Sequence, residues 1–429
     1  MSKLALLGGD PEVRGPLPPY PSMGQTEMEA VLDVVRSGCL SGFYGDASPE
    51  FLGGSQVRAF EESWGARYDV PHVVSMNSAT SGLFAAMGAI GVGPGDEVIV
   101  PCTTMSATAM APLVYGAIPV FVDIEDETFC LDLECVRAAI TPRTRAILAV
   151  NLFGHPARLA DLRALADAKG LFLVEDNAQA PLGREHGLAC GTIGHIGVFS
   201  LNFHKHIHTG EGGMCVTADA RLAERLQLIR NHGENLVEPR KIEDAANIIG
   251  FNYRMTELSA AVGLAQLAGI DDHVEIRERL AQRLSNGTRD LPGWKVPAVR
   301  EQCRHNYYCW TPCFDENVVG IDRDTFSRAL IAEGFPHAQA YVKPLYMLPV
   351  FQRRIGFGRD GFPFNQTEQR YEKGMCPVAE RLHEREILFF EPCAYLVDDN
   401  LADQLVEAVR KVHTQAGELV GMRDAKVSP

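Results

Sequence analysis

The sequence has no run of eighteen consecutive apolar residues, so it lacks the element that a membrane-spanning helix requires. Its first fifteen residues, "MSKLALLGGDPEVRG", contain only a short apolar run, which is not the pattern of a secretory signal peptide. Basic residues are also scarce, since 40 Lys and Arg face 55 Asp and Glu and the net charge is −15. That balance argues against a nucleic-acid-binding protein, which needs a clustered basic face. We therefore expect a cytoplasmic protein that binds neither a membrane nor nucleic acid.

The cysteines do not form the pattern of a disulfide framework. There are eleven of them, an odd and scattered set, which favours reduced thiols. One group, Cys303, His305, Cys309 and Cys313, offers an alternative interpretation as a zinc site. It has no Cys-x-x-Cys pair and aromatic residues interleave it, so zinc is disfavoured there.

What the chain does contain is a regular alternation of short apolar runs and amphipathic segments. Strands are predicted at 97–101, 118–124, 145–153 and 171–176, and helices between them at 108–117, 132–140 and 158–170. This alternation predicts an α/β fold in which a mainly parallel sheet lies between two helical layers. Ligands of such sheets bind at the carboxyl ends of the strands.

Beyond residue 219 helical patterns dominate, including one long helix predicted over 256–285. Glycine and proline in 287–297 mark a boundary. We predict an N-terminal segment (1–50), a large ligand-binding domain (51–286) and a smaller C-terminal α+β domain (287–429). The stretch 343–378 is predicted to be a long ordered loop.

Two segments place polar groups where such a fold binds ligands. Asp176 ends a buried strand, where it is either a helix N-cap or the partner of a positive group on a ligand. Gln179 lies on the same side if a helical turn follows. "NSATSG" (77–82) begins a helix with small residues, which either cap the helix or expose its N–H groups to an anion.

The third segment, "FSLNFHKHIHTGEGG" (199–213), places Lys205 just after a predicted strand. If the chain stayed extended, His204, His206 and His208 would share one face and suggest a metal site, but Glu211 is the only nearby carboxylate. A lysine at a strand exit facing the crevice is either a surface residue or, when desolvated, a Schiff-base nucleophile.

One cofactor has a group for each of these three positions. Pyridoxal 5′-phosphate (PLP) has an aldehyde for Lys205, a pyridinium for Asp176 and a phosphate for the helix start at 79–82. Asp176 would keep the ring nitrogen protonated, so that the ring can accept electrons, and Lys205 would move the substrate proton.

The motifs together resemble a known family, the DegT/DnrJ/StrS aminotransferases of keto-sugars and keto-cyclitols, which are fold-type I PLP enzymes. The resemblance covers nearly the whole chain. It rests on "ATSGL" (79–83), "GVGPGDEVIVP" (91–101), "VFVDI" (120–124), "AITPRTRAI" (139–147), "EDNAQA" (175–180), "GVFSLNFHKHIHTGEGG" (197–213) and "GFNYRMTELSAAVG" (250–263).

The resemblance implies a role for each matching residue. Lys205 matches the Schiff-base lysine, Asp176 the partner of the ring nitrogen and Gln179 the residue beside the ring hydroxyl. The matches to phosphate contacts are Thr80, Ser81, Ser200 and, from the neighbouring subunit of a homodimer, Asn252.

Two positions depart from the family pattern. Met105 stands where an aromatic residue usually stacks on the ring, although a thioether also packs against a π face. His195 replaces the usual Asp before the lysine strand.

The implied activity is PLP-dependent transamination of a ketone on a polyhydroxylated ring, with glutamate or glutamine as the donor. The ketone is either a nucleotide-linked ketosugar or a ketocyclitol. One alternative is a PMP-dependent sugar dehydratase of the same fold, which has histidine in place of the Schiff-base lysine. The other is a non-catalytic PLP-binding regulator, which needs an added segment that we do not expect at either terminus.

Overall fold

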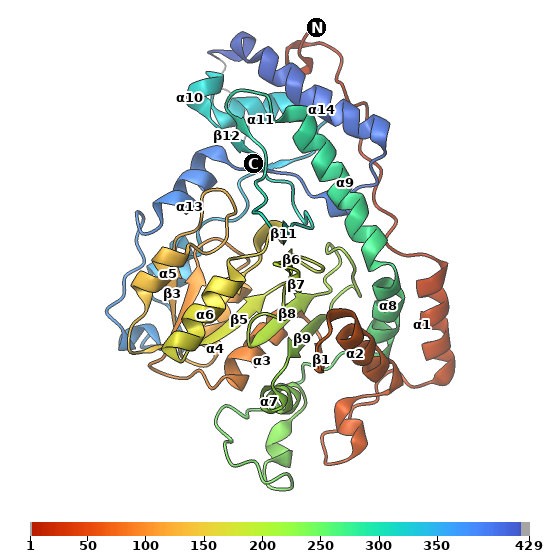
Figure 1. Ribbon diagram of the computed structural model, residues 1–429, viewed down its shortest axis with the longest axis vertical. Helices are drawn as coiled ribbons and strands as arrows, with labels where there is room; N and C mark the ends of the chain where they lie inside the picture. The colour runs from red at the N-terminus through yellow and green to blue at the C-terminus, as the bar shows by residue number, and fades with distance from the viewer. Residues whose placement is uncertain (1, 422–429) are drawn as a thin grey trace.

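The computed structural model of the chain describes residues 2–421. Its centre is a seven-stranded sheet with the order β1-β9-β8-β5-β4-β2-β3 (Figure 1). The strands are β1 (His72–Met76), β2 (Glu97–Pro101), β3 (Ile118–Val122), β4 (Thr144–Val150), β5 (Phe172–Asp176), β8 (Ile196–Ser200) and β9 (Gly213–Thr217). The pairs from β8 to β3 are parallel, whereas β9 runs antiparallel to both β1 and β8. The predicted α/β class, with a mainly parallel sheet, is confirmed.

Helices cover both faces of this sheet. On one face α3 (Ala79–Ala89), α4 (Ala107–Val114) and α7 (Ala220–Arg230) contact the strands, and on the other lie α5 (Leu133–Ala139) and α6 (Leu159–Lys169). α2 (Ser55–Tyr68) packs on β1. Every residue of β2 and β3 is buried, as expected of parallel strands that are covered on both sides.

The prediction of one long helix over 256–285 is wrong, because two helices meet at Gly269. α8 (Glu257–Ala268) ends there and α9 (Ile270–Thr288) begins one residue later. The Gly269 N–H bonds to the carbonyl of Gln266, three residues back, so the i→i−4 ladder is interrupted. Asp271 and Asp272 then occupy the first turn of α9, where negative charge favours a helix start.

A second core lies beside the sheet and includes both ends of the described chain. It is enclosed by α9, α11 (Arg323–Ala332) and α14 (Asp399–Thr414), and Leu4 and Val13 contribute to it. Two backbone hydrogen bonds tie residues 18–20 to residues 394–396, Tyr20 N–H to Ala394 and Leu396 N–H to Pro18. We call this N-terminal stretch the strap. The predicted domain boundaries stay predictions.

The remaining elements are short, apart from one helix. The helices are α1 (Gln25–Ser37), α10 (Glu316–Val319), α12 (Pro349–Gln352) and α13 (Pro377–Arg381). One small sheet has the order β11 (Cys303–Arg304), β6 (Arg184–Glu185) and β7 (Leu188–Ala189). Two further strand pairs are β10 (Trp294–Lys295) with β12 (Cys313–Phe314) and β13 (Ala338–Gln339) with β14 (Leu388–Phe389). No helix within residues 2–421 combines the length and the apolar content needed to cross a bilayer.

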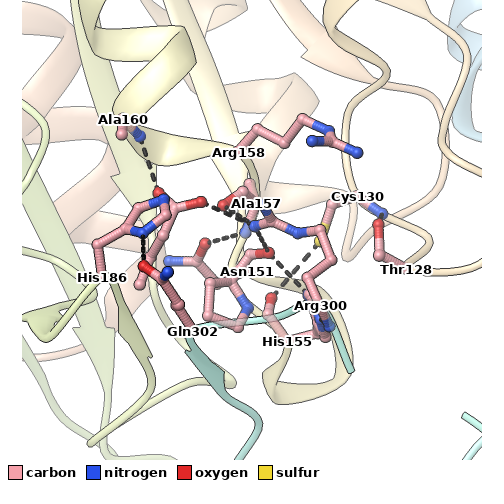
Figure 2. A network of polar contacts seen from close by, with 12 residues as sticks. Thr128, Cys130, Asn151, His155, Ala157, Arg158, Ala160, His186, Arg300 and Gln302 are labelled. Carbon is pink, nitrogen blue, oxygen red and sulfur yellow. Dashed lines mark hydrogen bonds and ion pairs between the residues drawn. The ribbon is translucent and has the colours of Figure 1, made fainter. Parts of the chain in front are cut away.

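One arginine connects the C-terminal part of the chain to the loop that follows β4 (Figure 2). The Arg300 guanidinium donates to the carbonyls of Pro156 and Ala157, at 2.9 and 2.7 Å, and to the buried Glu185 carboxylate at 2.9 Å. The Arg300 backbone N–H donates to His155 Nε2 at 3.1 Å. Glu185 also accepts from the Ala160 N–H, so this carboxylate links three segments that are distant in sequence.

We predict that Arg300→Met lowers the free energy of unfolding by about 3 kcal/mol, because it leaves the Glu185 carboxylate buried without a cation. Arg283→Met is the matched control, since the Arg283–Asp403 pair is largely exposed and its loss should change stability by less than about 1 kcal/mol. Urea unfolding of both variants measures the difference. Equal midpoints for the two variants would contradict the structural role of Arg300.

Candidate active site

Asp176 ends β5 at the carboxyl edge of the sheet, and its side chain is 4% exposed. Its carboxylate accepts hydrogen bonds from Thr108 Oγ1 at 2.8 Å and from the Ala178 N–H at 3.2 Å. Burial raises the pKa of Asp176, while these two hydrogen bonds and the charge of Lys205 lower it. Neutral donors therefore orient the carboxylate, and Lys205 is the cation whose charge lowers its pKa.

The preceding residue, Glu175, points to the opposite face and has a structural role. Its carboxylate accepts the N–H groups of Gly191, Ile193 and Gly194 at 2.6 to 2.8 Å. These bonds hold the turn that leads into β8. The turn leads directly into β8, which pairs with β5. By holding the turn, Glu175 therefore helps to position β8 and the loop after it that carries Lys205.

Lys205 lies in the loop between β8 and β9, as predicted for a strand exit. Its Nζ is 4.2 Å from the centroid of the Tyr308 ring. Burial lowers the pKa of this ammonium, and the neighbouring Cys309, Asp176, Cys393 and Glu391 raise it. The side chain is partly buried, in keeping with a desolvated amine rather than a freely solvated surface lysine.

The start of α3 lies directly against β9. Ser78 caps the helix by accepting the Ser81 N–H at 3.0 Å, and Ser81 Oγ donates to Asn77 at 2.6 Å. Helix geometry leaves the first N–H groups, those of Ala79 and Thr80, without intrahelical acceptors. A Cβ on Gly213 would lie 2.6 Å from the Ser78 backbone, so glycine is required for this close approach.

The three histidines around Lys205 have different surroundings. His206 is buried, with Nε2 3.0 Å from the Asn306 carbonyl and Nδ1 3.7 Å from the Cys393 thiol. His204 is exposed, and His208 accepts the Gly210 N–H at Nδ1. Among residues 2–421, the one cluster with metal-ligand geometry comprises Cys102, Asp123 and Cys376, so neither these histidines nor the Cys303–Cys313 group assembles into a ligand set.

The other residues matched by resemblance lie around the same edge. Gln179 is buried, accepts the Phe153 N–H at 2.7 Å and donates to the Tyr341 hydroxyl at 2.9 Å. Ser200 closes β8 and is partly buried. Thr80 is exposed at the start of α3, and Met105 is 57% exposed just before α4.

Asn252 has an exposed side chain that accepts a hydrogen bond from Arg254 at 2.8 Å. Its carbonyl accepts from Asn77 Nδ2 at 3.4 Å, and the Tyr253 carbonyl accepts the Asn77 N–H at 2.8 Å. The segment therefore lies beside the turn before α3 within its own chain, a proximity that the sequence did not predict.

His195 has a structural explanation. Its Nδ1 accepts the Leu173 N–H of β5 at 2.9 Å, and its Nε2 lies 3.6 Å from the Asp167 carboxylate. A histidine at this position thus satisfies a backbone donor at the start of β5, which an aspartate carboxylate is equally able to do.

Several residues that shape the site were missed from the sequence. Thr108 holds Asp176, Tyr308 lies beneath Lys205, and Tyr341 orients Gln179. Tyr308 is one of the aromatic residues that interleave the Cys303–Cys313 group, and this unusual density of aromatic and sulfur side chains was the available signal. Thr108 and Tyr341 carried no local signal.

The residues at this edge fit PLP. A desolvated amine, a buried carboxylate with an open acceptor position and free N–H groups at a helix start match its aldehyde, ring nitrogen and phosphate. Lys205, Asp176 and the start of α3 would hold these three groups.

Comparison with known proteins gives the same assignment. A model of the DegT/DnrJ/EryC1/StrS aminotransferase family matches residues 21–410. L-glutamine:2-deoxy-scyllo-inosose aminotransferase of Streptoalloteichus tenebrarius is 35% identical, and the match covers 97% of this chain and 99% of that protein. UDP-N-acetyl-3-dehydro-alpha-D-glucosamine 3-aminotransferase of Acidithiobacillus ferrooxidans is 36% identical over 79% of this chain and 84% of its own length.

Among solved structures, DesI in the presence of its TDP-sugar product superposes with a TM-score of 0.82. The two chains are 30% identical, and the match covers 98% of this chain and 99% of that one. Similarity therefore extends over the sheet and over the C-terminal part of the chain.

Burial of His206 gives a pH-dependent prediction. Burial foremost, then the charge of Arg277, lowers its pKa from 6.5 to about 3. Between pH 6.5 and 3 the unfolded chain therefore binds a proton that the folded chain excludes, and stability is lost as the pH falls. We predict that His206→Gln reduces this loss by about 1.4 kcal/mol per pH unit.

Urea unfolding at pH 7, 6 and 5 measures the slope. His186→Gln, at an exposed position, shows whether removal of any histidine has the same effect. An unchanged slope in His206→Gln would contradict a neutral, buried His206.

Proposed function

The chain belongs to the DegT/DnrJ/EryC1/StrS aminotransferase family, and from this premise we propose that it aminates a ketone on a polyhydroxylated ring. The predicted family, enzyme class and PLP cofactor are confirmed, because this family consists of PLP-dependent aminotransferases. The proposal concerns the substrate, the donor, the assembly and the roles of individual residues.

The observation that carries the proposal is that the partly buried Lys205 and the buried Asp176 lie near each other at the carboxyl edge of the sheet. Each of the two groups shifts the pKa of the other. The start of α3 reaches the same region, because Ser78 lies against Gly213, which pairs with Ser200 at the end of β8. A surface lysine would have neither the burial nor the carboxylate, and a histidine at position 205 would favour the dehydratase alternative. The named relatives are aminotransferases.

When bound, PLP supplies an electron sink that stabilises negative charge at the reacting carbon. In our proposal Asp176 holds a proton at the ring nitrogen, and Thr108 keeps its carboxylate oriented. Lys205 Nζ moves a proton to or from the reacting carbon, which its lowered pKa favours at neutral pH. Gln179 lies beside the ring hydroxyl, and Thr80, Ser81 and Ser200 contact the phosphate.

The substrate class follows from two kinds of relatives. The relative named for 2-deoxy-scyllo-inosose matches almost end to end, which supports a ketocyclitol acceptor and a glutamine or glutamate donor. The relatives named for UDP-linked and TDP-linked sugars support a nucleotide-linked ketosugar. We propose the ketocyclitol as the first acceptor to test.

We also propose a homodimer in which the exposed side chain of Asn252 reaches the phosphate of the neighbouring subunit, while its backbone stays beside Asn77 of its own chain. In support, α1 exposes Met28, Leu32 and Val35 along one side, and such apolar stripes are usually covered in an assembly. Sedimentation velocity of the purified chain decides between dimer and monomer. Eleven unpaired cysteines favour the reducing cytoplasm as its location, which cell fractionation tests.

We predict that the amine form of the enzyme returns to the aldehyde form when it is mixed with the correct ring ketone. A panel of ketocyclitols and nucleotide-linked ketosugars, followed by absorbance of the bound cofactor, identifies that ketone. Simple aliphatic ketones serve as controls. Failure of every polyhydroxylated ketone to react would contradict the proposed substrate class.

Two substitutions separate the roles of Lys205 and Asp176. We predict that Lys205→Ala abolishes both covalent attachment of PLP and turnover, whereas Asp176→Asn retains attachment and lowers kcat at least about 100-fold. An amide does not keep the ring nitrogen protonated. Borohydride reduction with peptide mapping identifies the attached lysine, and Asp167→Asn is the exposed control. A label on another lysine, or near-normal Asp176→Asn turnover, would refute the assignments.

A further inference from the structure

Lys205 also lines a cavity of about 410 Å³ that is enclosed by four separate segments. Tyr20 of the strap and the nearby Ser22 form one wall, and Lys205 and its neighbours Phe203, His204, His206 and His208 form another. The helices α8 and α9 contribute Gln266 and Arg277, and the last wall is formed by residues 391–394. Donor and acceptor of a transamination both have to approach Lys205, and this cavity provides space beside the reacting amine.

Arg277 is the unusual group in this cavity. Its side chain is 1% exposed, yet no carboxylate of residues 2–421 lies within ion-pair distance of it. Other deeply buried cations are paired, as Arg230 is with Glu61 at 2.6 Å and Lys411 with Glu333 at 2.9 Å. A buried charge without a counter-ion is costly, which indicates that the partner of Arg277 is a group supplied from outside the described chain.

The guanidinium is nevertheless firmly oriented. It lies 3.9 Å from the centroid of the Tyr20 ring, and the Tyr20 hydroxyl is 2.6 Å from His273 Nδ1. Its Nη1 donates to the carbonyl of His273, one turn earlier on α9, whereas Nε is buried without an acceptor. A guanidinium that is held in place but has no counter-ion is typical of a site that binds an anion.

Cys393 lies near both Arg277 and Lys205. Burial raises the pKa of its thiol, whereas the charges of Arg277 and Lys205 and a hydrogen bond with Arg277 lower it. Glu391 is the only carboxylate among the cavity-lining residues, and it pairs with neither cation within 4 Å among residues 2–421. Within this cavity, an anion that reacts at Lys205 is attracted by Arg277 and repelled by Glu391.

We propose that Arg277 binds a carboxylate of the amino-acid donor and so selects amino acids over simple amines. This rests on the proposed function, in which every donor is an amino acid and carries a carboxylate. A guanidinium binds a carboxylate through parallel N–H donors, whereas ring hydroxyls are neutral and leave its charge uncompensated. The phosphates of a nucleotide-linked acceptor are the competing source of negative charge.

The test separates the two half-reactions. In Arg277→Met we expect the donor concentration for half-maximal conversion to the amine form to rise about 30-fold, which is about 2 kcal/mol. The half-reaction of the amine form with the ring ketone should change less than about threefold. Arg279→Met, on the exposed side of the same helix, is the matched control and should leave both half-reactions unchanged.

Stability supplies an independent readout. Since Arg277→Met removes an unpaired buried charge and keeps the volume, the urea midpoint of the holoenzyme without donor should stay equal or rise. Addition of 2-oxoglutarate should raise the midpoint of the wild type but not that of Arg277→Met.

The opposite results would overturn the proposal. A lower midpoint with equal losses in both half-reactions would make Arg277 a structural residue, and a loss confined to the ring ketone would assign its anion to the acceptor. If no amino acid converts the wild type to its amine form, the proposed function fails instead. The Arg277 site is then tested by stability alone. It is refuted if 2-oxoglutarate raises the midpoints of the wild type and of Arg277→Met equally.

Discussion

The parallel pairing of β5 with β4 and β8 is the constraint on which the whole site depends. Parallel neighbours bring their carboxyl ends to one edge, so Asp176 at the end of β5 and the loop after β8 leave the sheet together. The antiparallel strand β9 then returns the chain beside β8 and brings Gly213 against the start of α3. An amine, a carboxylate and a helix N-terminus converge without any of them being adjacent in sequence.

The neighbouring carboxylates of Glu175 and Asp176 have different roles at this edge of the sheet. Glu175 and Asp176 are both buried, and burial raises the pKa of both. Strand alternation points them to opposite faces, where Glu175 meets three backbone N–H groups and Asp176 meets one hydroxyl and one N–H. The saturated carboxylate stabilises the fold, and the one with remaining acceptor capacity faces the crevice.

Periodicity predicted the sheet well because the signal is local. Strand 97–101 agrees with β2 residue for residue, and Asp176 was recognised because it ends a buried run. The break at Gly269 was missed because the apolar pattern continues through it, and only the backbone hydrogen bond shows the interruption. Thr108 and Tyr308 were missed for another reason: each meets its partner across many intervening residues, and such contacts leave no periodic trace. The family resemblance supplied roles, but it did not indicate the solitary charge of Arg277.

The strap has a consequence for biosynthesis. Tyr20 lies over Arg277 only while residues 18–20 are hydrogen-bonded to residues 394–396, which are synthesised some 375 residues later. A ribosome-bound chain can therefore complete its central sheet long before this wall of the cavity closes. This wall of the cavity forms only when residues 394–396 have been synthesised, and proteolytic loss of either segment would open the cavity while sparing the sheet.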